Sequence, residues 1–424
     1  MLLQFKVNNF RSIKDTAVLS MNAGKGKTTV NSIESKGYHI LKSAVIYGAN
    51  ASGKSTVLNA LAYMREMVLN RYKVTQSVDK LPHFPFLLNT ETETASSHFE
   101  IIFLKGDCKY RYGFEVDSEK VYSEWLYADT RGKESRLFQR NIEGNIFYVN
   151  QLKFKEGRRL KAIDNQLFIW RCDQEGGEVS KTILEWFYDL NLLNGLQNQP
   201  YIDFALEQMK DPNIKATLLD LLKKADLSIN DLKIDEQDIP DEQAKELPLP
   251  AEIMEKILSG GARITSSDIQ TSHKKFDADN NATGATYFSL NTDESQGTKK
   301  FLALSAPILD TLKSGKILLI DEIDASLHPM LTEGLIKLFH NAENNPFNAQ
   351  LIFTTHDVSF LSRPQLFGRD QIWFTEKNLY GSTELYSLLE FRKNSKGKDV
   401  RSTDNLEKHY LQGQFGAVPY LGDF

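Results

Sequence analysis

The chain has 424 residues, 41% of them hydrophobic and 25% charged, with a net charge of -5 and an isoelectric point near 6.0. These values are ordinary for a soluble globular protein, and they exclude an overall basic field that would draw the chain onto nucleic acid or a membrane. The two cysteines, Cys108 and Cys172, are too few for a disulfide framework or a cysteine-bound metal cluster. No apolar run approaches the roughly 20 residues of a membrane helix, and the first residues do not form a secretory signal. We therefore expect a cytoplasmic protein that does not enter a membrane.

The first third of the chain predicts strands around one helix. Leu3, Phe5 and Val7 alternate with polar residues, which indicates a strand at the N-terminus. A second apolar strand, residues 44–47, leads into the sequence GANASGKST, after which apolar residues recur at helical spacing. Residues 98–148 contain alternating segments separated by turn sequences, and this pattern predicts an antiparallel meander.

The rest of the chain predicts helices first and then alternating strands and helices. From about 178 to 260 the spacing is helical, as in residues 181–193, 213–227 and 251–260, with an acidic, proline-containing loop or linker predicted at 233–250. The later elements are predicted as a strand at 285–290, a helix at 301–313, a strand at 317–320, a helix at 329–341 and a strand at 351–354. This order predicts one α/β nucleotide-binding unit split by an insertion. The predicted parts are residues 1–97, 98–150, 151–265 and 266–424.

The sequence GANASGKS, Gly48 to Ser55, matches the phosphate-loop pattern and stands between a predicted strand and a predicted helix. Its glycines let backbone N–H groups curl around a β-phosphate, and the helix N-terminus adds its positive end. We expect Lys54 to reach the β- and γ-phosphate oxygens of ATP and the Ser55 hydroxyl to bind Mg²⁺. The nucleotide-binding residues expected in this segment are Gly48, Asn50, Ser52, Gly53, Lys54, Ser55 and Thr56.

Two adjacent acids follow the apolar strand at 317–320. We expect Asp321 to hold the hydration shell of Mg²⁺ and Glu322 to orient or deprotonate the attacking water. Carboxylates are also common as solvated residues at strand ends. An apolar run that ends in two acids, in a chain that already has a phosphate loop, favours the catalytic interpretation.

His356 follows the strand at 351–354, in the sequence LIFTTHD. At the carboxyl edge of a parallel sheet, where ligands collect, it would contact the γ-phosphate. A lone histidine is more often a hydrogen-bonded structural residue, so the motifs around it carry the catalytic interpretation.

Taken together, five motifs resemble the ABC-type ATPases of the RecF/SMC/OLD group. They are NNFRSIKD, GANASGKST, ESQGTKKFL, LLIDEIDASLHP and LIFTTHD, and the last four resemble a phosphate loop, a signature, a Walker B with D-loop, and an H-loop. The chain is most similar to the RloA/AbiL type of bacterial defence ATPase, which is encoded beside a TOPRIM-like partner. The segment YLQGQFGAVPYL, residues 410–421, also resembles the ending of that family.

The resemblance implies an ABC-type P-loop ATPase fold with an antiparallel β-lobe and a helical insertion between the Walker A half and the signature and Walker B half. It also implies a homodimer or higher homo-oligomer that traps ATP between the phosphate loop of one subunit and the signature of the other, with residues 324–327 as the D-loop. The implied roles are catalytic for Lys54, Glu322 and His356, metal-binding for Ser55 and Asp321, nucleotide-binding in trans for Ser295 and Gly297, and proximity to the nucleotide for Arg11.

The sequence departs from the group at two motifs. The usual signature begins Leu-Ser-Gly-Gly, whereas here Glu294 and Gln296 flank the serine and only the second glycine is kept. The region expected to hold a Q-loop, residues 83–94, contains no glutamine, so that residue is unassigned.

Three functions remain open at this stage. The first is an ATP-hydrolysing sensor of an antiphage defence module that controls a separate effector, expected to be a TOPRIM-like nuclease because the chain has no nuclease constellation of its own. The second is a RecF-like repair ATPase that binds DNA, and the third is a scaffold that turns ATP over slowly. The basic segments 153–161 and 273–276 would suit DNA or RNA, although the first is more typical of a solvated hairpin.

Overall fold

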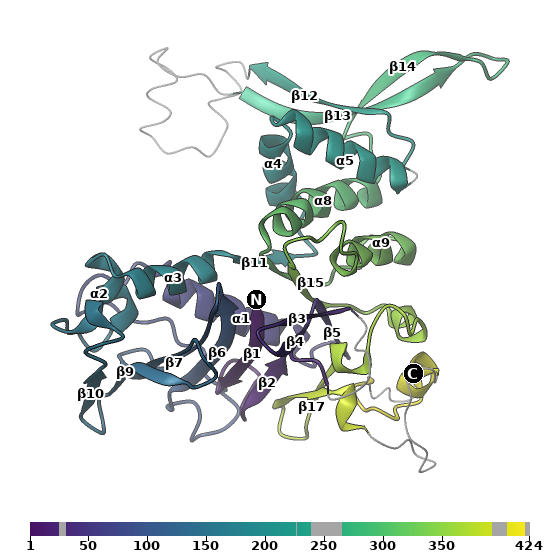
Figure 1. Cartoon of the computed structure of the whole chain (residues 1–424). Coiled ribbons are helices and arrows are strands. Elements are labelled where there is room, and N and C mark those ends of the chain that lie inside the picture. The colour runs from purple at the N-terminus through teal and green to yellow at the C-terminus, as the bar shows by residue number, and fades with distance from the viewer. Residues whose placement is uncertain (25–30, 226, 239–264, 392–404, 420–424) are drawn as a thin grey trace. The chain divides into compact units, whose positions relative to one another are not determined.

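The computed structural model describes residues 1–24, 31–225, 227–238, 265–391 and 405–419 (Figure 1). The chain divides into two compact units. Unit 1 comprises residues 1–196, 311–325 and 336–424, and unit 2 comprises residues 197–310 and 326–335. The division into four parts made from the sequence stays a prediction. Within the described ranges, no helix is long and apolar enough to cross a membrane.

Unit 1 contains a seven-stranded antiparallel sheet in the order β10-β9-β8-β7-β6-β1-β2. Its strands are β1 (Leu2–Asn8), β2 (Ala17–Ser20), β6 (Ser97–Lys105), β7 (Cys108–Val116), β8 (Val121–Asp129), β9 (Ser135–Asn141) and β10 (Ile146–Val149). The antiparallel β-lobe is confirmed, and it extends into the N-terminal strand because β1 pairs with β6. A separate hairpin joins β3 (Ser32–Ser35) to β4 (Tyr38–Leu41).

The second large sheet of unit 1 has the order β11-β15-β16-β5-β17-β18. Its strands are β5 (Ser43–Gly48), β11 (Leu190–Asn194), β15 (Ile317–Asp321), β16 (Gln350–Thr354), β17 (Ile372–Lys377) and β18 (Thr383–Ser387). The first five strands in this order are parallel to one another, and β18 is antiparallel to β17. Short, fully buried apolar runs of this kind are typical of parallel sheets.

Helix α1 (Lys54–Val68) contacts both sheets. The ring of Tyr63 lies 4.9 Å from that of Phe99 on β6, and Leu58 belongs to the same apolar core as Ile317 and Ile352 of the parallel sheet. The other helices of unit 1 are α2 (Phe168–Gln174), α3 (Glu178–Tyr188), α10 (Leu406–Leu411) and the 3-10 turns η1 to η4 at 155–157, 358–362, 369–371 and 388–390. Because one helix is packed against both sheets, the loop that leads into it is held firmly.

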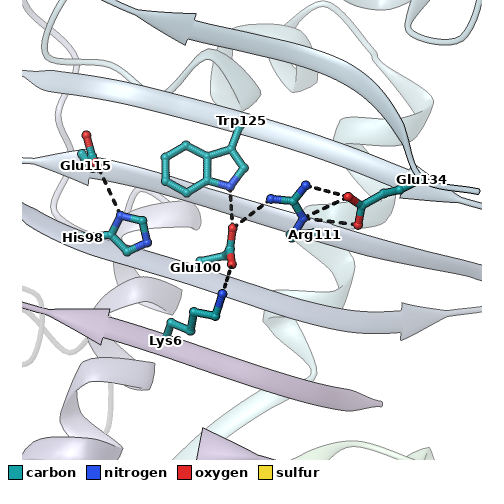
Figure 2. Close-up of polar contacts among 7 residues, drawn as sticks. All are labelled: Lys6, His98, Glu100, Arg111, Glu115, Trp125 and Glu134. Carbon is teal, nitrogen blue, oxygen red and sulfur yellow. Dashed lines mark hydrogen bonds and ion pairs between the residues drawn. The ribbon is translucent and has the colours of Figure 1, made fainter. Parts of the chain in front are cut away.

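One face of the antiparallel sheet carries a cluster of polar and charged side chains (Figure 2). Glu100 accepts hydrogen bonds from Lys6 Nζ at 3.0 Å, Trp125 Nε1 at 3.0 Å and Arg111 at 3.2 Å. Burial alone would raise the pKa of Glu100, but the hydrogen bonds and charges of Lys6 and Arg111 outweigh it and lower the pKa. The charges on this face therefore stabilise the sheet itself.

Unit 2 combines helices with a three-stranded antiparallel sheet in the order β12-β13-β14. Its elements are α4 (Gln199–Gln208), α5 (Pro212–Lys224), β12 (Asp231–Asp238), β13 (Thr265–Phe276), β14 (Ala282–Ser289), residues 296–310 of α8 (Gln296–Ser314) and residues 329–335 of α9 (Pro329–His340). Leu218 and Leu222 of α5 are buried, as are Leu232 of β12 and Ile269 of β13. The leucine-rich helix predicted from the sequence thus contributes to the core of this unit.

Two segments of the predicted helical insertion are strands instead. Residues 190–194, of which 190–193 were predicted as helix, form β11 and pair in parallel with β15 from Leu190↔Ile317 to Asn194↔Asp321. Residues 231–238, of which 233–238 were predicted as loop, form β12 and pair with β13. Short apolar runs fit either state, and the neighbouring strand decides between them by supplying backbone hydrogen bonds. The remaining linker, residues 239–250, and the predicted helix 251–260 lie outside the described residues.

The basic segment 153–161 was predicted as a hairpin, and this prediction is also wrong. The segment forms a turn and the short 3-10 helix η1. The ring of Phe154 is fully buried and packs against Gly157, which is also buried. Burial of this ring, and not pairing between two strands, holds the segment in place. Cys108 and Cys172 are both free, which agrees with the expected lack of a disulfide framework.

Candidate functional site

The carboxyl ends of four parallel strands meet on one edge of the second sheet. The ladder places β5 between β16 and β17, with β15 on the far side of β16. The residues that follow these strand ends line a hollow of about 700 Å³. Its lining consists of Ser12, residues 50–56, Glu322, His356 and Lys377. In open α/β sheets, ligands bind at this edge.

The phosphate loop joins β5 to α1, as predicted. Lys54 Nζ donates to the carbonyl oxygens of Gly48 at 2.8 Å and Ala49 at 3.2 Å, so its ammonium group lies inside the curve of the loop. Burial lowers the pKa of Lys54, while the charges of Glu322 and Asp321 act in the opposite direction. Ser55 lies in the first turn of α1, at the positive end of the helix.

Two threonines of the neighbouring strands hold this loop from behind. Thr375 Oγ1 on β17 lies 2.7 Å from Ser52 Oγ, and Thr383 Oγ1 on β18 lies 2.8 Å from the carbonyl oxygen of Ser52. A Cβ atom at Gly48 would lie 2.5 Å from Ser52 Oγ and from Thr375 O. At Gly53, where φ is +108°, a Cβ would collide with the side chain of Thr383. Both glycines are therefore required by close packing.

The predicted loop residues differ in what their side chains do. Ser52 is only 3% exposed, and its hydroxyl is used inside the loop. Asn50 is exposed at the tip of the loop. Thr56 accepts a hydrogen bond from Ser12 Oγ at 3.0 Å, which ties the helix to the segment after β1.

The two acids lie where the sequence predicts: Asp321 is the last residue of β15, and Glu322 begins the turn that follows it beside the end of β16. Thr354 Oγ1 donates to Asp321 Oδ1 at 2.7 Å and accepts from the backbone N–H of Glu322 at 2.7 Å. Glu322 has φ of +55°, which is uncommon for a residue with a side chain. Its carboxylate oxygen lies 3.7 Å from His356 Nε2, and the backbone N–H of His356 donates to Asp324 at 3.2 Å. Glu322 and His356 are thus neighbours on the rim of the hollow.

The donor set fits Mg²⁺. The Ser55 hydroxyl and the Asp321 carboxylate are hard oxygen ligands, and Mg²⁺ in phosphate sites typically takes one or two protein oxygens beside phosphate oxygens and water. No group of three or more His, Cys, Asp or Glu side chains suited to a metal occurs within the residues that the structure covers, so an all-protein metal cage has no support there.

Arg11 lies beside the 700 Å³ hollow but does not line it. It lines a neighbouring hollow of about 450 Å³, which shares Ser12 and Lys377 with the larger one. Its guanidinium carbon lies 5.6 Å from the ring centroid of Phe10 and 5.4 Å from that of Phe84. Proximity of Arg11 to a bound nucleotide stays a prediction.

The signature segment belongs to unit 2. Ser295 Oγ accepts from the backbone N–H of Thr298 at 3.1 Å and so caps helix α8. Glu294 lies 2.7 Å from His273 Nε2 on β13. Gly297 would tolerate a Cβ atom, whose nearest neighbour would be Ser326 O at 3.4 Å. Contact of Ser295 and Gly297 with a nucleotide stays a prediction.

Sequence reasoning missed five residues at this site: Ser12, Thr354, Thr375, Lys377 and Thr383. Two of them had a signal, because Ser12 follows Arg11 and Thr354 ends the strand before His356. The other three come from β17 and β18, which carry no recognisable motif, and only the sheet order brings them to the phosphate loop.

Comparison with known proteins gives a matching family and solved structures of similar fold. The family model described as "AAA domain, putative AbiEii toxin, Type IV TA system" matches residues 43–362, about three quarters of the chain. No curated protein matches the chain. The SMC head domain from Thermotoga maritima is similar over 91% of this chain and 98% of its own, at 12% identity and a TM-score of 0.39.

The family match covers the phosphate loop, the signature, both acids and His356. It supports ATP binding and hydrolysis and confirms the predicted ATPase family, whereas closeness to the RloA/AbiL type stays a prediction. The chain belongs to the family of AAA domains described by that model.

Proposed function

We propose that the chain is an Mg²⁺-dependent ATPase that acts as a homodimer and regulates a separate effector in a bacterial defence module. The observation that carries the ATPase proposal is the 700 Å³ hollow, in which the phosphate loop, Lys54, Glu322 and His356 face one another. Lys54 would bind the β- and γ-phosphate oxygens, and the N-terminus of α1 would add its positive end. Mg²⁺ held by Ser55 and Asp321 would neutralise charge on the phosphates.

In this proposal Glu322 is the base. It accepts a proton from a water whose oxygen bonds to the γ-phosphorus, while the bond from that phosphorus to the β–γ bridging oxygen breaks and ADP leaves. His356 lies 3.7 Å from the Glu322 carboxylate, so it can hold that carboxylate in place and contact the γ-phosphate.

The homodimer and the defence role rest on different support. The exposed Ser295 at the start of α8 would contact the γ-phosphate of a second subunit, as the resemblance to ABC-type ATPases implies. The family description names a toxin of a toxin–antitoxin system, which supports a defence role. The effector would be a protein encoded nearby, and co-purification of the products of the native operon would identify it.

A RecF-like role on DNA is the second candidate. It is favoured by the basic segment 153–161, in which Lys153, Lys155, Arg158, Arg159 and Lys161 are all exposed. Binding of this kind would weaken steeply with salt. A duplex-binding titration at two salt concentrations, with and without Mg-ATP, separates it from the defence role.

The test of the ATPase is the substitution Lys54→Ala. Loss of charge-assisted hydrogen bonds to phosphate should weaken ATP binding by about 100-fold and reduce hydrolysis to background. Lys80→Ala, at a surface lysine paired with Glu119, is the matched control and should behave as the wild type. Undiminished hydrolysis by Lys54→Ala would show that the hollow is not the ATPase site.

A further inference from the structure

We propose that Thr354 is a positioning residue of the hydrolysis site, whose single hydroxyl sets both the metal-binding and the water-activating carboxylate residues. The inference rests on the proposed ATPase function. Thr354 is fully buried at the end of β16 and does not line the 700 Å³ hollow, so it acts through its neighbours and not on the substrate.

The two hydrogen bonds of Thr354 are mutually compatible. A hydroxyl group has one hydrogen to donate and lone pairs to accept with. Here the hydrogen goes to Asp321 Oδ1, and a lone pair receives the N–H of Glu322, each at 2.7 Å. Thr354 Oγ1 is therefore hydrogen-bonded to both the side chain of Asp321 and the backbone of Glu322.

The first bond orients the metal-binding carboxylate. The hydrogen bond from the threonine to Oδ1 restrains the rotation of the Asp321 carboxylate, which would face the hydration shell of Mg²⁺ when the ion is bound. Hydrogen bonds of this kind from outer residues orient metal ligands and are worth a large share of the activity of a metal site.

The second bond holds the backbone of Glu322 in an unfavourable conformation. A φ of +55° is strained for a residue with a side chain, and such a conformation persists only when the surrounding structure holds it. Three hydrogen bonds attach this turn to the end of β16: Glu322 N–H to Thr354 Oγ1, Ile323 N–H to Thr354 O at 3.2 Å, and His356 N–H to Asp324 at 3.2 Å. Only the first of them depends on the hydroxyl.

Thr354 has no packing reason to carry a hydroxyl. The strand reads Gln-Leu-Ile-Phe-Thr, all buried, and valine has the same shape as threonine and suits a buried parallel strand better. A buried hydroxyl costs stability unless it is hydrogen-bonded, so its presence at the base of the two acids is explained by the acids.

The test compares three variants of the full chain. Thr354→Val removes the hydroxyl and keeps the shape, Thr354→Ser keeps the hydroxyl, and Thr355→Val is the matched control. Thr355 is equally buried, but its hydroxyl accepts from Asp357 N–H at 3.0 Å and does not contact either acid.

For Thr354→Val we expect kcat for ATP hydrolysis to fall by roughly 10- to 100-fold. KM should be nearly unchanged, because the contacts proposed between Lys54 and the phosphates do not involve Thr354. The Mg²⁺ concentration for half-maximal activity should rise. Thr354→Ser should recover most of the loss, and Thr355→Val should stay within about twofold of the wild type. An equal loss in both valine variants, or no recovery by serine, overturns the proposal.

Hydrogen exchange tests the same inference without turnover. The amide of Glu322 should exchange faster in Thr354→Val than in the wild type, Thr354→Ser or Thr355→Val, as measured by mass spectrometry on peptides spanning 317–327. If the wild type does not hydrolyse ATP, the proposed function fails and exchange alone decides the role of Thr354. Unchanged exchange at Glu322 in Thr354→Val refutes that role whatever the activity.

Discussion

The phosphate loop of unit 1 and the signature segment of unit 2 are held in opposite ways. The loop is enclosed: Thr375 and Thr383 pack behind it, and Lys54 lies within its curve. The signature segment is open: Ser295 is exposed, and its hydroxyl bonds the first turn of its own helix. Glu294 beside it bonds His273 of the adjacent sheet.

This difference indicates which segment binds the phosphates and which segment a second subunit would approach. A loop whose backbone is held from behind presents its N–H groups without having to reorganise, and such pre-organisation favours tight phosphate binding. At the exposed start of α8, the Ser295 side chain caps the first turn. A ligand could approach this helix end from solvent without displacing other parts of the protein. We therefore expect the loop to determine affinity and the signature segment to determine turnover.

The largest effect should come from Glu322→Gln. Loss of the base should reduce kcat by about 1,000-fold while ATP still binds, since Lys54 and the loop are untouched. The protein should accumulate as a closed dimer in Mg-ATP, which chromatography with light scattering would detect. Glu119→Gln, at an exposed carboxylate, is the control. An unchanged mass for Glu322→Gln would contradict closure across two subunits.

Gly53→Ala should disrupt the packing of Thr383 against the phosphate loop. The new Cβ meets the side chain of Thr383 at a backbone angle of +108°, and we expect a loss of about 3 kcal/mol in the free energy of unfolding. Gly37 has φ of +76° with nothing within 4 Å of its Cβ position, so Gly37→Ala should cost only about 1 kcal/mol. Urea unfolding of both variants measures the difference. Equal costs would mean that Thr383 does not clamp the loop.

Acid should weaken unit 1 through His340. Its Nε2 lies 2.8 Å from Ser43 Oγ at the start of β5, and burial, with the charges of Lys42 and Lys337, lowers its pKa from 6.5 to about 3. In the unfolded chain His340 is protonated below about pH 6.5, whereas in the folded chain it stays neutral down to about pH 3. The free energy of unfolding therefore decreases as the pH falls from 6.5 to 3. We expect a loss of about 2 kcal/mol near pH 5 relative to pH 7.

The control for this prediction is His340→Gln, which keeps a polar group near Ser43 and cannot titrate. Its stability should vary less between pH 7 and pH 5 than that of the wild type. Hydrogen exchange at the two pH values should place the difference in the strands of unit 1. If both proteins lose stability equally, His340 does not account for the acid sensitivity.

The smallest effect on stability should come from Ser295. Ser295→Ala removes the cap of α8 and should cost about 1 kcal/mol of stability. Ser295→Asp restores a capping oxygen but places a negative charge where the γ-phosphate is expected. We predict near-wild-type thermal stability with strongly reduced kcat for Ser295→Asp. Full activity of this variant would restrict Ser295 to capping and remove the trans contact.

Much of the site could be predicted from local sequence because its chemistry is contiguous. Gly48 to Ser55 form one turn between a strand and a helix, and Asp321 and Glu322 are adjacent at a strand end, so their spacing alone indicates what they do. Periodicity likewise predicted the meander and the strands at 317–320 and 351–354, since buried strands in this chain are short apolar runs between turn residues.

Tertiary structure alone decided which strands surround these motifs. The sequence predicts residues 190–193 as the end of a helix, but they pair in parallel with β15. It predicts residues 233–238 as a loop, but they pair with β13. Thr375 and Thr383 reach the phosphate loop only because β17 and β18 follow β5 in the sheet, and Thr354 reaches the acids only because β16 lies beside β15. A side chain's chemistry is local and can be read from sequence, but its partners are set by strand order, which depends on contacts between residues far apart in the chain.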